Sequence, residues 1–252
     1  MPAMSLTPKH RALVLGYGSL LATVAGFVNA VAILTLAFPV ANVTGTTTQL
    51  GMDAANPWLF DGGLLAFILI GFLMGAAAAG ATLSPTKPHA GARHSAVMTV
   101  EAFLLVLAFT WSHYALSIFF AAVACGLQNG TTSSLRTMQL RTTHFTGTVT
   151  DLGLIIGRSR WHGVDSWRIT VLSATVVTFI VGGIVGTVLG TEIGEAALLL
   201  PAVVCVVIAI AGLVYDRNLR EAASSGEPQQ PDPGEPEDPA LRTSSSAMYR
   251  VG

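Results

Sequence analysis

Six stretches of mostly apolar residues follow one another along the chain, separated by short polar segments. They cover residues 12–37, 61–83, 95–111, 114–130, 168–190 and 196–215. A helix needs about 17–25 residues to cross a hydrocarbon core of about 30 Å, and each stretch is close to that length. The third and fourth stretches meet at the segment SHY (112–114), so we expect a tight helical hairpin there. The pattern predicts an all-α polytopic membrane protein with six transmembrane helices.

Composition supports a membrane protein. The chain is 52% hydrophobic and 11% charged, and its mean hydropathy is +0.62. Soluble globular domains carry about 25% charged residues, so this chain lacks the charge to cover a soluble surface of its size. Lys9 and Arg11 precede the first apolar stretch, as in a signal peptide. That stretch exceeds a typical cleavable core of about 7–15 residues, so we expect it to stay as the first spanning helix.

The positive charges predict the orientation of the helices. Cytoplasmic loops of membrane proteins carry an excess of Lys and Arg. If the N-terminus is inside, segments 1–11, 84–94, 131–167 and 216–252 are also inside, and they hold all 13 Lys and Arg when Arg168 at the edge of a span is included. The outside segments carry only acids: Asp53, Asp61, Glu192 and Glu195. We therefore expect both termini to be cytoplasmic.

Two polar Thr-Gly segments interrupt the apolar pattern at matched places: NVTGTTTQLG at 42–51 and FTGTVTDLG at 145–153. Gly26, Asn29, Thr44, Gly45, Leu50 and Gly51 correspond to Gly126, Asn129, Thr146, Gly147, Leu152 and Gly153, with an offset of 100 for the first two and 102 for the rest. Further on, Gly71 and Gly75 align with Gly182 and Gly186 at an offset of 111. Each unit holds three helices, an odd number, so the second must start from the opposite side of the membrane. This predicts an inverted repeat, as in many secondary transporters.

The same residues carry a resemblance to a known family. GFVNA followed by NVTGT, and GLQNG followed by TTHFTGTVTDLG, resemble the YoaK-type family of bacterial membrane proteins, a domain of unknown function. The resemblance extends from about residue 15 to about residue 215. It implies a six-helix fold in the bacterial inner membrane, with no established substrate or reaction. Family members commonly have Met-Thr-Gly-Asn in the first motif, where this chain has Val43-Thr44-Gly45-Thr46.

These patterns divide the chain into four parts. We expect a cytoplasmic N-terminus at 1–11, a first membrane repeat at 12–111, a second, inverted repeat at 112–216 and a cytoplasmic tail at 217–252. From about residue 221 the tail is rich in Pro, Ser, Gly and Glu. Such a segment cannot bury enough apolar surface to offset its ordering entropy, so we predict that it is disordered.

Each Thr-Gly segment predicts a short half-helix or re-entrant segment, from Thr44 to about Ala54 and from Thr146 to about Ile156. Threonine is a good N-cap, and glycine permits a tight turn. A helix N-terminus presents free N–H groups and a partial positive charge. Two inverted half-helices can converge on one midplane site for an anion, a carboxylate or a polar neutral solute. The alternative is an interfacial loop that contributes only to the fold.

The expected site is therefore built from matched polar residues. The candidates for substrate binding are Asn29, Thr44, Gly45, Gln49, Asn129, Thr146, Gly147 and Asp151. An amide within an apolar span should face the bundle interior, where Asn29 and Asn129 either line a pathway or tie helices together. Asp151 corresponds to the neutral Gln49. It binds a cation or proton, or it simply caps and solvates the cytoplasmic end.

Glu101 is the acid that lies well inside a predicted span. It is about six residues from the expected start of the helix, next to His94, which corresponds to a depth of roughly 9 Å. An intramembrane carboxylate is a candidate for proton or ion coupling. A boundary error of one turn would instead leave it near the headgroups.

A small-solute transporter or channel is the function that these patterns favour, and a non-transporting scaffold or regulator acting through its tail is the alternative. We do not expect an enzyme, because the spans contain no nucleophile–base pair and no metal-ligand spacing. His113 stands alone at a helix end, and the other histidines are expected in loops: His10, His89, His94, His144 and His162. Cys125 and Cys205 lie in apolar segments, as small hydrophobes do.

Expected partners are the lipid bilayer and a small polar solute or anion, with a homo-oligomer left open. No cofactor, metal or nucleic acid is expected.

Overall fold

The computed structural model describes residues 8–57, 59–83, 91–134 and 142–224, and within these ranges the chain is helical, without strands. The helices are α1 (Pro8–Leu36), α2 (Val43–Ala55), α3 (Gly62–Thr82), α4 (Ala92–Thr110), α5 (Ala115–Ser133), α6 (Phe145–His162), α7 (Ser166–Ile193) and α8 (Leu199–Ser224), with a short 3₁₀ helix, η1 (Gly194–Leu198), between the last two. Each predicted apolar stretch corresponds to one of the long helices.

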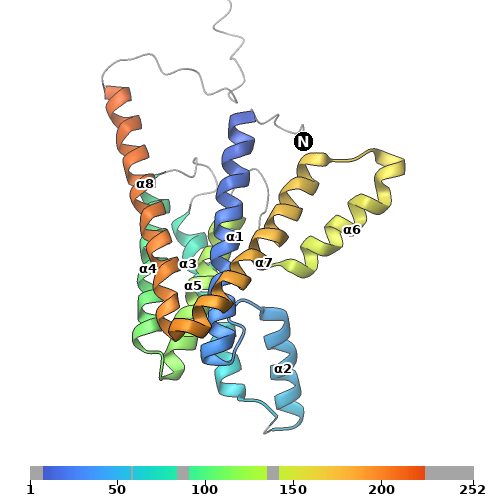
Figure 1. Ribbon diagram of the computed structural model, residues 1–252, viewed down its shortest axis with the longest axis vertical. Coiled ribbons are helices and arrows are strands. Elements are labelled where there is room, and N and C mark those ends of the chain that lie inside the picture. The colour runs from blue at the N-terminus through green and yellow to red at the C-terminus, as the bar shows by residue number, and fades with distance from the viewer. Residues whose placement is uncertain (1–7, 58, 84–90, 135–141, 225–252) are drawn as a thin grey trace, which may run out of the picture.

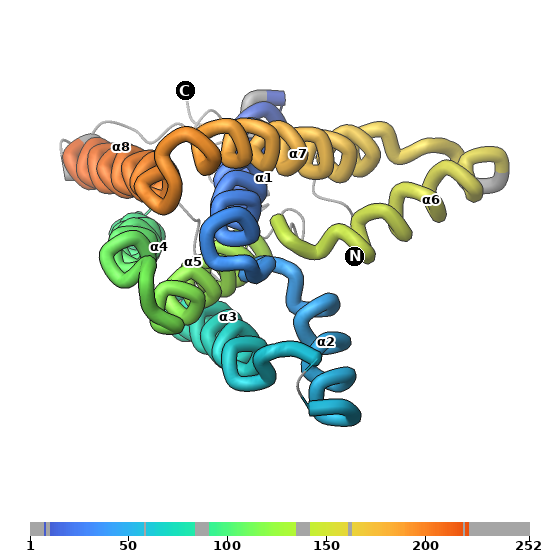
Figure 2. Tube along the Cα trace, turned by 60° about the horizontal axis from the view of Figure 1, so that its bottom comes forward, coloured from blue at the N-terminus to red at the C-terminus, as the bar shows by residue number. Residues whose placement is uncertain are grey.

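The long helices form one bundle with α1 and α5 in its interior (Figures 1 and 2). Helix α1 packs along α7, and α5 packs along α3; α1 and α5 also contact each other. Helix α4 packs between α5 and α8. The chain turns back between α7 and α8 at Gly194, whose positive φ of 60° suits glycine.

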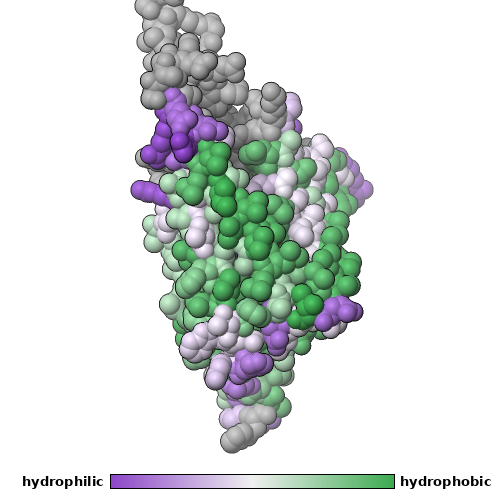
Figure 3. All heavy atoms as spheres, turned by 60° about the vertical axis from the view of Figure 1, so that its left-hand side comes forward, coloured by the Kyte–Doolittle hydropathy of each residue, from purple (hydrophilic) through white to green (hydrophobic). Residues whose placement is uncertain are grey.

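Five helical stretches are long and apolar enough to cross a membrane: Arg11–Leu36, Gly62–Thr82, Ala92–Thr110, Ala115–Ser133 and Ser166–Asn218. The last has 53 residues, about 80 Å if it were straight, but it folds back at η1 and so contains both α7 and α8. Large apolar side chains such as Leu73, Phe103 and Val207 are exposed on the outside of the bundle. Figure 3 shows apolar side chains covering the middle of one face, with polar residues towards its two ends. These features indicate a polytopic membrane protein.

Helix α8 continues to Ser224, into the segment expected to be the cytoplasmic tail. Ion pairs between side chains four residues apart support its last turns: Arg220 with Asp216 at 2.9 Å and Arg217 with Glu221 at 2.7 Å. The greater part of the predicted tail, 225–252, lies outside the described residues, as does the predicted N-terminal segment before Pro8.

Glycines allow two pairs of helices to touch backbone to backbone. A Cβ on Gly26 of α1 would overlap the carbonyl of Phe179 in α7. In the same way, a Cβ on Gly126 of α5 would overlap the carbonyl of Phe72 in α3. Small residues are the usual means by which membrane helices approach closely. The α1–α7 and α3–α5 contacts are therefore built alike.

The reciprocal glycines show how the two crossings correspond. Gly182 of α7 lies against the Thr23 carbonyl, and Gly75 of α3 lies against the Val123 carbonyl. Thr23 and Val123 differ by 100 in number, as expected, whereas Gly75 and Gly182 differ by 107. The sequence alignment of these two helices at an offset of 111 is thus wrong by one helical turn. Small residues recur every fourth position in both helices, so the sequence pattern matches equally well when it is shifted by a turn.

We predict that Gly75→Ala lowers the stability of the folded bundle by about 1–3 kcal/mol, because the added methyl group must displace the backbone of α5. Thermal unfolding of the purified protein in detergent measures this change. Gly80→Ala, on the same helix, is the control, since a Cβ there meets nothing within 4 Å. Equal unfolding midpoints for the two variants would contradict the close crossing.

Candidate functional site

Short helices begin at both Thr-Gly segments, as predicted, but the threonines do not cap them. The N-caps are Asn42 for α2 and His144 for α6. The side chain of Asn42 accepts a hydrogen bond from the Gly45 N–H at 3.1 Å. Thr44 and Thr146 lie in the first turns with exposed side chains. The caps were missed because asparagine at 42 is an equally good cap and lies one residue ahead of the first helical residue.

The interior-facing threonines of these segments are instead Thr46 and Thr148. Their exposed fractions are 0% and 8%. The Thr46 hydroxyl donates to the Asn42 carbonyl, and the Thr148 hydroxyl donates to the His144 carbonyl, both at 3.0 Å. Both hydroxyls donate hydrogen bonds within their own segments, so they are not directed at a ligand.

Gly45 and Gly147 make room for the capping residues. A Cβ on Gly45 would lie 2.6 Å from Nδ2 of Asn42, and a Cβ on Gly147 would overlap the His144 imidazole. The space beside each glycine is therefore filled by a side chain of the same segment.

Asn29 and Asn129 hold the chain that leads into each short helix. Oδ1 of Asn29 accepts a hydrogen bond from the Ala41 N–H at 3.0 Å. Oδ1 of Asn129 accepts one from the Thr143 N–H at 3.4 Å. Each asparagine thus ties the end of a long helix, α1 or α5, to the segment before α2 or α6.

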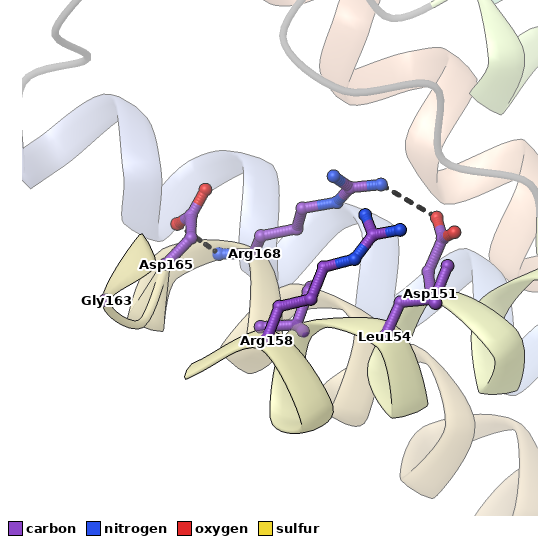
Figure 4. Close-up of a pocket in the computed structure, with 7 residues that line it drawn as sticks. Asp151, Leu154, Arg158, Gly163, Asp165 and Arg168 are labelled. Atoms are coloured by element: carbon purple, nitrogen blue, oxygen red, sulfur yellow. Dashed lines mark hydrogen bonds and ion pairs between the residues drawn. The ribbon is translucent and has the colours of Figure 1, made fainter. Parts of the chain in front are cut away.

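Asp151 lies on the surface in an ion pair. Its carboxylate is 2.8 Å from the Arg168 guanidinium, which joins α6 to α7, and the two side chains are 42% and 49% exposed. They border an open cavity of about 450 Å³, shown in Figure 4 and lined by Asp151, Leu154, Ile155, Arg158, Gly163, Asp165 and Arg168. Two carboxylates face two guanidiniums there, so the cavity has no strong preference for either charge. An exposed pair of this kind contributes about 0–1 kcal/mol to stability.

The predicted substrate-binding residues do not share a cavity among the described residues. Both short helices begin near the middle of the molecule and run to opposite ends (Figures 1 and 2), and α2 and α6 are not among the helix pairs that pack together. Gln49 lies on α2, and its counterpart Asp151 faces α7. Geometry therefore leaves Glu101 as the candidate in the bundle interior.

Glu101 lies deep in the bundle, with an exposed fraction of 2%. Helix α4 begins at Ala92, earlier than predicted, which places Glu101 about 14 Å from its start. This is about one helical turn deeper along α4 than the sequence predicted. One carboxyl oxygen, Oε2, has no hydrogen-bond partner among the described residues.

Helices α1, α5 and α8 each bring a polar or polarisable side chain close to Glu101. The Cys205 thiol of α8 hydrogen-bonds to the carboxyl group. Cys125 of α5 and Tyr17 of α1 lie near enough to interact with it electrostatically. The carboxyl group is thus surrounded by neutral groups, with no cation beside it in the described part of the chain.

Gln128 is a further polar residue of this interior, next in sequence to the predicted site residue Asn129. Its exposed fraction is 2%, and its Nε2 has no hydrogen-bond partner in the described structure. The Ser117 hydroxyl donates to the Ala108 carbonyl at 2.7 Å, which fixes α4 and α5 in an antiparallel register. In this antiparallel register Gln128 of α5 lies level with Val97 of α4, which is about one helical turn from Glu101. Its spacing from Cys125 puts both on one face of α5.

His94 was expected in a loop, and this prediction is wrong. It lies in the first turn of α4 with an exposed fraction of 7%, and its Nε2 is 2.6 Å from the Tyr17 hydroxyl. His94 and Glu101 are seven residues apart, so they lie on the same face of α4. That heptad spacing was the signal available in the sequence.

The fold and this interior define the class: an all-helical polytopic membrane protein with buried polar residues among its central helices. Residues 17–211 match the family model described as a protein of unknown function (DUF1275). The chain belongs to this family, as the resemblance of its Thr-Gly motifs indicated. Neither the curated proteins nor the solved structures contain a match.

We predict that Asn29→Ala lowers stability by about 1–3 kcal/mol, because it leaves the buried Ala41 N–H without an acceptor. Thermal unfolding and the hydrogen exchange of the Ala41 amide measure the effect. Thr44→Val, at an exposed position, is the matched control and should change stability by less than about 0.5 kcal/mol. Unchanged protection of the Ala41 amide in Asn29→Ala would show that the side chain does not hold this segment.

Proposed function

We propose that this protein is a small-solute transporter or channel of the bacterial inner membrane, in which Glu101 is the proton- or ion-coupling residue. The observation that carries the proposal is a buried carboxyl group whose Oε2 has no hydrogen-bond partner and that has no cation beside it in the described part of the chain. An ionised carboxylate is costly in such surroundings unless it is paired. A proton or a bound cation would neutralise it, and this is the usual use of an acid inside a membrane protein.

The proposal includes an architecture of six transmembrane helices in two inverted repeats. The reciprocal glycine contacts of the α1–α7 and α3–α5 crossings support it. The sequence of buried and half-buried positions along 21–30 also recurs along 121–130. Secondary transporters with inverted repeats place their sites near the midplane, between the repeats, which is where a residue between α1, α4, α5 and α8 would lie.

The proposed orientation places the first residues of α1 and the end of α8 in the cytoplasm. Charges in the described residues support it. Arg11 and Arg93 lie at the beginnings of α1 and α4, and Arg217 and Arg220 lie near the end of α8. Gly91, which precedes α4, lies beside Asp216 of α8, so the beginning of α4 and the last turns of α8 are at the same end of the bundle.

The proposed site differs in place from the one expected at the Thr-Gly segments. Their polar groups are engaged in capping and in fixing the chain, which suits a supporting role for Asn29 and Asn129. Among the described residues, the Glu101 carboxyl and the Gln128 amide are two buried polar groups with an atom left for a solute or ion. Together they offer a charge and a neutral donor and acceptor, which suits a small cation or a polar neutral solute better than an anion.

We predict that a small solute raises the unfolding temperature of the detergent-solubilised protein and that this stabilisation depends on pH. Ligand binding to the folded state stabilises by about 2.7 kcal/mol at a concentration of 100 Kd. A screen of sugars, amino acids, organic acids, nucleobases and inorganic ions in mildly acidic and mildly alkaline buffers tests this. In Glu101→Gln the stabilisation should be lost or become independent of pH.

Glu192→Gln is the matched control, because Glu192 is an exposed carboxylate near the end of α7, away from Glu101. It should behave as the parent protein does. The proposal fails if no solute stabilises the parent, or if Glu101→Gln retains the same pH-dependent stabilisation.

A further inference from the structure

We infer that Glu101 exchanges protons with one side of the membrane only, through Tyr17 and His94. These two residues lie towards the arginine-rich end of the bundle, where Arg93, Arg217 and Arg220 are located. This inference rests on the proposed coupling role of Glu101. It adds a route and a direction, and it assigns Tyr17 and His94 as the residues that carry the proton.

The register of α4 against α8 shows which end of the bundle the route reaches. Glu101 pairs with Cys205, Ser95 lies against Gly212, and Gly91 lies beside Asp216. Residue numbers fall along α4 as they rise along α8, so the helices are antiparallel. Moving from Glu101 towards His94 therefore leads to the end where α4 begins and α8 approaches its last turns.

Polar groups lie among the buried residues along this half of α4, next to the apolar Val97 and Met98. Gln128 is about one turn from Glu101, and the Tyr17–His94 hydrogen bond is about another turn further on, roughly 10 Å from Glu101 along the helix. Oγ of Ser95 is buried beside them without a hydrogen-bond partner in the described structure. The Tyr17 hydroxyl also contacts the Met98 sulfur at 3.8 Å, which keeps the phenol on this face of α4.

The other half of the interior is apolar. Beyond Glu101, α4 buries Ala102, Leu105 and Ala108, and they belong to one cluster with Ala121 of α5 and Leu198 of η1. The buried Ser117 hydroxyl at that end is occupied by the Ala108 carbonyl. Among the described residues, buried polar groups follow one another towards His94 and do not do so on this side.

The transfer moves one proton without net change in the relay. The His94 imidazole accepts a proton at the arginine-rich end and donates one to Tyr17 through their hydrogen bond. The Tyr17 hydroxyl releases its own proton towards Glu101 through intervening water, and the carboxylate becomes a carboxylic acid. The titratable groups that face Glu101 are Tyr17 from α1, Cys125 from α5 and Cys205 from α8, with His94 on α4 itself.

The test uses the full-length protein in lipid vesicles, with the orientation checked by protease access to the chain termini. The pH is stepped on one side at a time, and the carboxylic acid C=O band of Glu101 is followed by time-resolved infrared difference spectroscopy. The band is assigned by its absence in Glu101→Gln. We expect it to follow a pH step on the arginine-rich side and to lag behind a step on the opposite side.

Tyr17→Phe, which keeps the ring, and His94→Gln should each slow the response by about tenfold or more, since a positioned proton donor or acceptor contributes factors of that size and above. Tyr114→Phe and His113→Gln are the controls, because both residues are exposed at the other end of α4. They should leave the rate unchanged.

The outcomes separate the two proposals. A Glu101 band that responds equally to both sides, or that is unaffected in Tyr17→Phe and His94→Gln, overturns the one-sided route while Glu101 remains a proton site. A band that never changes with pH on either side overturns both. The comparison of sides in the parent protein needs no variant, so a variant that fails to fold does not remove the test.

Discussion

The approach of helices at glycines is the contact on which the rest of the bundle depends. Lipid tails are as apolar as leucine side chains, so helices in a membrane gain little from hydrophobic burial and rely on close packing and interhelical hydrogen bonds. Gly26 and Gly182 let α1 and α7 meet along their backbones, and Gly75 and Gly126 do the same for α3 and α5. These pairs hold α1 and α5 in the interior, where α5, together with α8, forms the surface against which α4 packs.

Asp151 and Glu101 have very different surroundings, because α4 packs against α5 and α8 and buries Glu101. Asp151 lies at the surface, where water and Arg168 solvate its charge. Glu101 is enclosed by α1, α5 and α8, with two thiols and a phenol near it. A surface carboxylate of this type needs no functional explanation, but a buried one without a cation does. The proposed coupling role follows from that contrast, and so does the polar half of the interior through which we infer that protons reach it.

The Thr-Gly segments illustrate how far a repeated motif can be interpreted from sequence. The repetition correctly predicted two short helices, and it singled out Asn29 and Asn129, which make corresponding hydrogen bonds. It did not reveal what fills the space around them. Asn42 and His144 occupy the room that Gly45 and Gly147 leave, so the glycines suit a capping side chain as well as a ligand. A repeat in sequence shows that two local structures are alike, and it cannot distinguish a binding segment from a structural one.

The sequence by itself determined the apolar helices, their approximate ends and the short helices between them. These depend on local properties: the length of an apolar run, helix propensity and the spacing of polar residues. Only the tertiary structure decided that Gly75 pairs with Val123, that His94 reaches Tyr17 and that Gln128, rather than Asn129, is fully buried. Each of these depends on the rotation and register of one helix against another. In helices that are apolar on all sides, the sequence pattern leaves both free, because lipid and protein interior favour the same residues.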